Sequence, residues 1–209
     1  MSFATTADLH DAIKQREPRE FVSRFLFEPI PFAFSNDIDQ WIAWKSNLAE
    51  RLEVDPYDLV LTGSGAIGFS LNPAKNYRAF DDNSDIDVGV ISAHHFEVAW
   101  RYLRQLRPSW LTLPKEARSA IESHRKNYVF SGTIATDSIL ALLPFGQVWQ
   151  EALDGMASVT PTNGREVRLR IYKDFDALRA YQAYGIGRLR DDLLEKGDEE
   201  TLITTDERE

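Results

Sequence analysis

Two stretches decide the fold, LVLTGSG at residues 59–65 and SDIDVGV at residues 84–90. The first is a β-type apolar run that ends in Gly63-Ser64. In the second, the two-residue period of a strand places Asp85 and Asp87 side by side on one face and apolar residues on the other. Neighbouring carboxylates repel each other unless a cation lies between them. Because oxygen ligands suit Mg²⁺ and phosphates can complete its coordination, the pair predicts a site for a metal ion and a nucleotide.

This pattern resembles the nucleotidyltransferase superfamily, the polymerase-β-like fold, in which a strand, Gly-Ser and a short helix precede Asp-x-Asp on the next strand. Gly63-Ser64 and Asp85-Ile86-Asp87 match that pattern, and the resemblance covers residues 58–91 well and the other residues loosely. It implies an α/β (α+β) fold, with a small mixed β-sheet and flanking helices. It also implies that Asp85 and Asp87 are catalytic and bind Mg²⁺ or Mn²⁺, while Gly63-Ser64 binds the nucleotide phosphates.

Active members of the superfamily usually have a third carboxylate on a later strand beside Asp-x-Asp. The alternating stretch at 166–172 is the best candidate for that strand, so Glu166 is the predicted third catalytic carboxylate. The same face also carries Arg168 and Arg170. If the register places Arg168 beside Asp-x-Asp, a cation stands where a metal ligand should be.

The segment after Gly63-Ser64 predicts a phosphate-binding helix start. A short helix ends at Asn72-Pro73, and its first backbone N–H groups can point at phosphate oxygens. The following loop, residues 72–83, offers Lys75 and Arg78 as nucleotide-binding cations, although exposed loop cations are often simply solvated.

An alternative is a dinucleotide-binding fingerprint, because GSGAIG at 63–68 fits the G-x-G-x-x-G pattern and acids follow about twenty residues later. Three features count against it. The helix after the glycines is short, whereas a dinucleotide-binding fold needs a long crossover helix. The acids lie at the start of the next strand, whereas a ribose-binding acid should lie at its C-terminal end. This interpretation also leaves the pairing of Asp85 with Asp87 unexplained.

Composition predicts one domain over residues 1–197 with an N-terminal helical extension. The chain has 209 residues, of which 43% are hydrophobic, and no cysteine. Its net charge of −9 is concentrated in residues 191–209, so we expect residues 198–209 to form a disordered acidic tail and we expect no binding of duplex DNA. No apolar run could span a bilayer and the residues after Met1 do not form an export signal, which predicts a cytoplasmic protein without membrane contact.

The pattern of apolar residues predicts helices at 6–16, 35–52, 92–105 and 115–126, and a last helix from Asp174 to Gly197. Residues 134–143 fit either a strand or a helix. Asp137 lies within them, as a helix cap or as a site residue.

The resemblance leaves two functions open. The first is a transferase that moves a nucleoside monophosphate from an NTP to a hydroxyl of RNA, a protein or a small molecule. Small members of the superfamily occur in bacterial toxin–antitoxin and antiphage systems, which adds those roles by analogy of fold and size. The alternative is a catalytically degenerate member that binds a nucleotide or a protein partner as a regulatory subunit.

Overall fold

The computed structural model describes residues 3–206, and the side chains in that range apart from 73, 107 and 196–206. The strands are β1 (Leu59–Thr62), β2 (Ile86–Ile91), β3 (Thr133–Ala135) and β4 (Val167–Tyr172). The α-helices are α1 (Thr6–Gln15), α2 (Pro18–Phe21), α3 (Ile38–Leu52), α4 (Gly63–Ile67), α5 (Ala93–Gln105), α6 (Lys115–Asn127), α7 (Gly146–Ala157) and α8 (Phe175–Asp206). Short 3₁₀ or π segments used below are η1 (Val22–Phe27), η5 (Arg107–Thr112), η6 (Val129–Ser131) and η7 (Leu140–Leu142).

A four-stranded mixed sheet forms the centre of the described part of the chain, in the order β1-β2-β4-β3. β1 and β2 are antiparallel, β4 is parallel to β2, and β3 is antiparallel to β4. The predicted α/β class, with a small mixed sheet and flanking helices, is therefore confirmed. Thr62 on β1 and Arg168 on β4 are the two register neighbours of Asp87 on β2.

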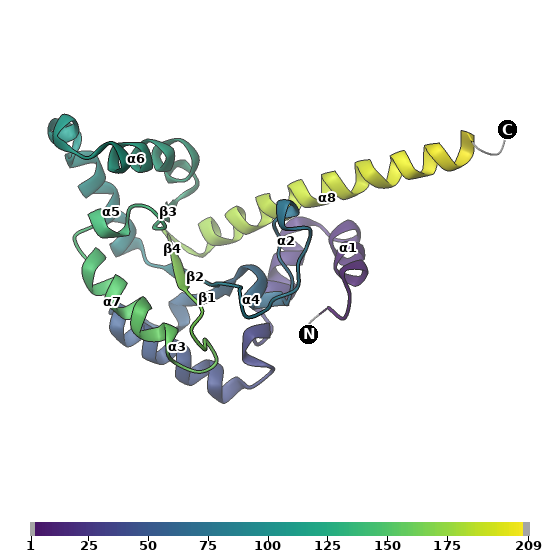
Figure 1. Cartoon of the computed structure of the whole chain (residues 1–209), viewed down its shortest axis with the longest axis horizontal. Coiled ribbons are helices and arrows are strands. Elements are labelled where there is room, and N and C mark those ends of the chain that lie inside the picture. The colour runs from purple at the N-terminus through teal and green to yellow at the C-terminus, as the bar shows by residue number, and fades with distance from the viewer. Residues whose placement is uncertain (1–2, 207–209) are drawn as a thin grey trace.

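The two faces of the sheet differ in chemistry because side chains alternate along each strand. One face is apolar and buried, with Val88, Leu169 and Ile171 in the core. The other carries Asp87, Gly89, Arg168, Arg170 and Tyr172. α8 crosses this second face, where Leu178 lies close to Gly89, and then extends outward past α1 and α2 (Figure 1). The acidic residues therefore lie on the face that the first turns of α8 cover.

Helix α3 is anchored to the loop before β4 by a buried hydrogen bond. Trp44, which is 2% exposed, donates its indole Nε1–H to Thr162 Oγ1 at 2.9 Å. Phe34 and Trp41 pack against the same indole. Burial of these rings and of the hydrogen bond fixes the segment that leads into β4.

Arg165 joins the loops that precede β2 and β4. Its guanidinium donates to the Asp82 carboxylate at 2.6 Å and to the Asp81 carbonyl oxygen at 3.1 Å, and it lies 5.1 Å from the centre of the Phe80 ring. Only 11% of its side chain is exposed. The contact places the starts of β2 and β4 next to each other, and thereby places Asp85 and Glu166 near each other.

Several predicted boundaries are corrected. α3 starts after Asp37 and not at residue 35 as predicted, because Ser35 has left-handed backbone angles. The Asp37 side chain accepts from the Gln40 N–H at 2.9 Å. Residues 134–143 contain the last two residues of β3 and the short segment η7.

The end of the chain also differs from the prediction. The last helix was predicted to end at Gly197, whereas α8 continues to Asp206, and 207–209 lie outside the described residues. A glycine within a helix costs only about 1 kcal/mol relative to alanine and does not by itself end the helix. Within residues 3–206, no helix is long and apolar enough to cross a membrane.

Candidate functional site

The site is organised by the contact between Gly63 and Asp87. Gly63 has a positive φ of 64°, and a Cβ at this position would lie 2.7 Å from Asp87 Oδ2. Only glycine adopts this turn readily and leaves room for the carboxylate. The bend between β1 and α4 therefore faces the second acid of the Asp-x-Asp pair directly.

A cavity of about 170 Å³ opens beside this contact. β1 and α4 contribute one wall, β2 and β4 the floor, and α8 the opposite wall. The main lining residues are Thr62, Gly63, Asp87, Arg168, Arg170 and Tyr181. We call this cavity the acid pocket.

Arg168 links two of the predicted catalytic carboxylates. Its Nη1 lies 2.9 Å from Asp85 Oδ2, and its Nη2 lies 2.7 Å from Glu166 Oε2. The hydrogen bond from Arg168 lowers the pKa of Glu166, whose side chain is 62% exposed. Because the register neighbour of Asp87 on β4 is Arg168, Glu166 points to the guanidinium. Neither Glu166 nor Asp85 lines the acid pocket while Arg168 holds them.

Asp87 is the acid with the most unusual environment. Burial, and then the charge of Asp85, raise the pKa of its carboxyl, while Arg170 and Arg168 oppose that shift. Its ionised form is therefore costly in the protein alone, and a bound cation would relieve the cost.

Arg170 supplies the main positive charge inside the acid pocket. It donates to the Tyr181 hydroxyl at 2.6 Å, lies over the rings of Tyr128 and Tyr181, and approaches Asp137 Oδ2 at 3.4 Å. Asp137 follows β3, is exposed, and lines the same cavity as Asp87. The sequence left Asp137 open as a cap or as a site residue; the structure shows η7 starting without a side-chain cap, and it places Asp137 in the pocket.

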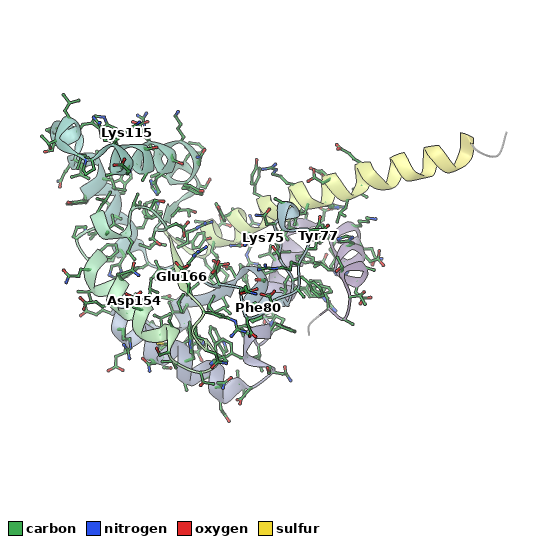
Figure 2. All side chains as sticks on the ribbon, viewed as in Figure 1. Lys75, Tyr77, Phe80, Lys115, Asp154 and Glu166 are labelled. Atoms are coloured by element: carbon green, nitrogen blue, oxygen red, sulfur yellow. The ribbon has the colours of Figure 1, made fainter. Side chains whose placement is uncertain are left out.

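The other predicted nucleotide-binding residues lie further from the acids. Figure 2 shows Lys75 and Tyr77 on the side of the molecule near α8, and the Tyr77 ring packs at 4.4 Å on His10 of α1. Arg78 is 3.7 Å from Asp81. Neither Lys75 nor Arg78 lines the acid pocket. Their loop is held toward the N-terminal helices, and the structure does not bring these two cations together with Gly63 and Asp87.

Ser64 lies in the first turn of α4, a helix of only five residues. Its carbonyl oxygen accepts from the Gly68 N–H at 2.8 Å, and its side chain does not line the acid pocket. The short helix and the antiparallel pairing of β1 with β2 are incompatible with a dinucleotide-binding fold, in which a long crossover helix joins parallel strands.

The acidic residues can supply only part of a metal site. Among the residues that the structure describes, no group of three or more His, Cys, Asp or Glu side chains is arranged to hold a metal ion. Asp85 and Asp87 provide oxygen ligands of the kind that Mg²⁺ prefers, and phosphate oxygens or waters could complete the shell. Two carboxylates of this kind could hold one cation together with a phosphate ligand.

Two groups of site residues were not predicted. Tyr181 and Gln182 reach the acid pocket because α8 turns back over the sheet directly after β4. The only sign of this turn in the sequence is that the strand and the helix follow each other closely along the chain. Arg170 was visible as a polar-face residue of β4, but its position in the pocket depends on the pairing of β4 with β2.

Comparison with protein-family models, with curated proteins and with solved structures gives no match to this chain. The resemblance to nucleotidyltransferases therefore rests on the matched motif and on the geometry of the acid pocket. We carry the family, the metal and the reaction forward as proposals.

Proposed function

We propose that the chain is a nucleotidyltransferase-like protein that binds a nucleoside triphosphate together with one divalent cation in the acid pocket. The observation that carries the proposal is the contact between the Gly63 bend and the Asp87 carboxylate. It joins the two halves of the sequence motif, the phosphate-binding turn and the metal-binding acids, at one point. The absent Cβ of Gly63 leaves room for the Asp87 carboxylate, and the backbone N–H groups of the bend are the groups that phosphate oxygens would meet.

Each residue has a distinct task in this proposal. Asp87 and Asp85 hold Mg²⁺ or Mn²⁺, which would neutralise phosphate charge. The backbone at Gly63-Ser64 and the guanidinium of Arg170 bind phosphate oxygens. Arg168 holds Asp85 at 2.9 Å, so it must release that carboxylate before both acids can bind the cation.

The position of Arg168 favours binding without transfer. A third carboxylate would complete a second metal site and help to deprotonate the attacking hydroxyl. Here the register neighbour of Asp87 is an arginine, and Glu166 is paired with it. We therefore favour a catalytically degenerate, nucleotide-binding protein that acts on a protein partner as a regulatory subunit.

Transfer is the second candidate, and Asp137 favours it. This carboxylate lines the same pocket as Asp87 and could replace Glu166 as the third acid. In that reaction a hydroxyl of RNA, a protein or a small molecule gives its proton to the Asp137 carboxylate, and its oxygen attacks the α-phosphorus. A new O–P bond forms, the bond to the β-phosphate oxygen breaks, and pyrophosphate leaves.

Two experiments test these proposals. The first titrates ATP, GTP, CTP and UTP with Mg²⁺ into the wild type, Asp87→Ala and the matched control Asp154→Ala, an exposed acid on α7 (Figure 2). We expect Asp87→Ala to lose the Mg²⁺-dependent part of NTP binding and Asp154→Ala to retain it; equal Mg²⁺-dependent binding by all three proteins would refute the site.

The second experiment follows label from each α-³²P NTP into protein, RNA or small products of a cell extract. Binding without label transfer supports the regulatory protein. Transfer that Asp137→Asn abolishes and Glu166→Gln retains supports the enzyme, and it would overturn the degenerate alternative.

A further inference from the structure

A second and larger cavity, of about 460 Å³, lies between α5, η5 and α6. Trp100, Leu103, Trp110, Ile121, His124 and Val129 form most of its wall. It shares no lining residue with the acid pocket. Its volume falls within the range of about 300–1,000 Å³ that is usual for small-ligand sites. We call it the tryptophan pocket.

The wall of the tryptophan pocket offers flat aromatic surface. Trp100 and Trp110 are partly buried, whereas the other three tryptophans of the chain are at most 8% exposed in the core. The guanidinium carbon of Arg104 lies 4.3 Å from the centre of the Trp100 ring. Such a surface suits a planar ligand, because stacking on indole and guanidinium planes tolerates any flat ring.

Of the two arginines at the tryptophan pocket, Arg104 is the one without an acidic partner. Arg125 forms an ion pair with Glu122 at 2.8 Å, so its charge is already matched. Arg104 has no carboxylate within ion-pair distance in the described part of the chain. A ligand with a negative group next to its planar ring would therefore complement the charge of Arg104.

His124 adds a hydrogen-bonding requirement inside the pocket wall. It is 4% exposed, and its Nε2 has no hydrogen-bond partner among the described residues. Burial lowers the pKa of His124 to about 4, against the opposing effect of a hydrogen bond to the Thr133 backbone. The ring is neutral at pH 7, and with the other nitrogen donating to Thr133, Nε2 is an acceptor without a partner. The atom itself is buried, so a ligand N–H reaches it only when the pocket wall moves.

We propose that the tryptophan pocket binds a nucleotide, with its base stacked on Trp100, a base N–H at His124 and a phosphate at Arg104. A planar heteroaromatic ring, an N–H donor and an adjacent anion are the three properties that the pocket selects. A free mononucleotide and an end of single-stranded RNA both have them. This site goes beyond the proposed function, because none of its residues belongs to the acid pocket.

Strand β3 connects the two pockets. His124 bonds to the Thr133 backbone at the start of β3, and Asp137, beyond the end of β3, lines the acid pocket. β3 has three residues and Asp137 lies in the turn after it, so one short strand joins residues of the two pockets. A second nucleotide would thus lie close to the acid pocket without entering it.

Tryptophan fluorescence and calorimetry in the presence of EDTA provide the test. The ligands are AMP, GMP, CMP, UMP, adenosine and a six-nucleotide single-stranded RNA. We expect saturable quenching by at least one mononucleotide, weaker binding of adenosine than of AMP, and loss of the quenching in Trp100→Leu. Tighter binding of the RNA than of the mononucleotides would identify RNA as the source of the base, and the reverse order would identify a free nucleotide.

Matched variants make the outcome specific. Arg104→Gln should weaken mononucleotide binding by about tenfold, because it removes both the phosphate contact and the stacked guanidinium. Arg101→Gln is the control, since Arg101 lies on the same helix and pairs with Glu97 at 2.5 Å. Asp87→Ala should bind as the wild type does, which separates this site from the acid pocket. Absence of saturable binding at millimolar nucleotide, equal weakening by both arginine variants, or loss of binding in Asp87→Ala would overturn the proposal.

Discussion

Replacing Gly63 with alanine tests the geometry of the acid pocket most directly. The new Cβ would lie 2.7 Å from Asp87 Oδ2, and the residue would keep a φ of 64°. A left-handed conformation costs an L-residue about 1–2 kcal/mol. The clash adds about 1–3 kcal/mol, because the packed carboxylate must move. We therefore expect Gly63→Ala to lower the free energy of unfolding by about 2–5 kcal/mol, and to abolish the Mg²⁺-dependent binding of NTP.

Gly164 provides the control for backbone strain. It has a φ of 85°, and a Cβ there would meet nothing within 4 Å, so Gly164→Ala carries strain without a clash. Urea unfolding at pH 7 should show a cost of about 1–2 kcal/mol for this variant. In an Asp87→Ala background the nearest atom is gone, and the cost of Gly63→Ala should fall to that of Gly164→Ala. A cost of Gly63→Ala that equals the control, or that does not change in the Asp87→Ala background, would refute the contact and the proposed nucleotide site with it.

Three further predictions concern charge and buried polar groups. Burial raises the pKa of Asp87, so wild-type stability falls as the pH rises from 3.8, the usual pKa of Asp, to the raised pKa in the folded protein. Without divalent cations, Asp87→Asn should therefore unfold at a higher urea concentration than the wild type at pH 7. This gain should vanish below pH 3.8. Glu166→Gln should change NTP binding by no more than about twofold and lower the free energy of unfolding by less than about 1 kcal/mol, because its ion pair with Arg168 is exposed. Arg168→Gln should tighten divalent-cation binding by roughly threefold in calorimetry, because it releases Asp85. Thr162→Val should cost about 1–3 kcal/mol in urea unfolding, because the Trp44 N–H would stay buried without an acceptor.

The elements of the fold could be predicted where their residues carry a local period. Alternation at 166–172 predicted a strand, and β4 spans Val167–Tyr172. The expected helices at 6–16 and 92–105 are α1 (Thr6–Gln15) and α5 (Ala93–Gln105), the second capped by Ser92. In these segments the same residues supply both the local propensity and the buried face, so the local pattern and the tertiary packing agree.

The arrangement of the site could not be predicted to the same depth. Whether Glu166 or Arg168 stands next to Asp87 depends on the register between two strands about eighty residues apart, and neither strand encodes that register alone. Arg165 bridges the loops before the two strands through its contact with Asp82, and no sequence period reveals that contact. The position of Lys75 could not be predicted either, because its loop is held by the packing of the Tyr77 ring on His10.

Ion pairing within the site explains why Asp87 is the residue on which ligand binding should depend. Asp85 and Glu166 share Arg168, and Asp137 approaches Arg170, so three of the four acids near the pocket have a guanidinium at ion-pair distance. Asp87 has none among the described residues, and burial raises its pKa. A cation therefore gains most free energy at the one carboxylate without an ion-pair partner, which is also the carboxylate that faces the Gly63 bend. Because phosphate oxygens would approach from that bend, nucleotide and cation should bind together, each weakly in the absence of the other.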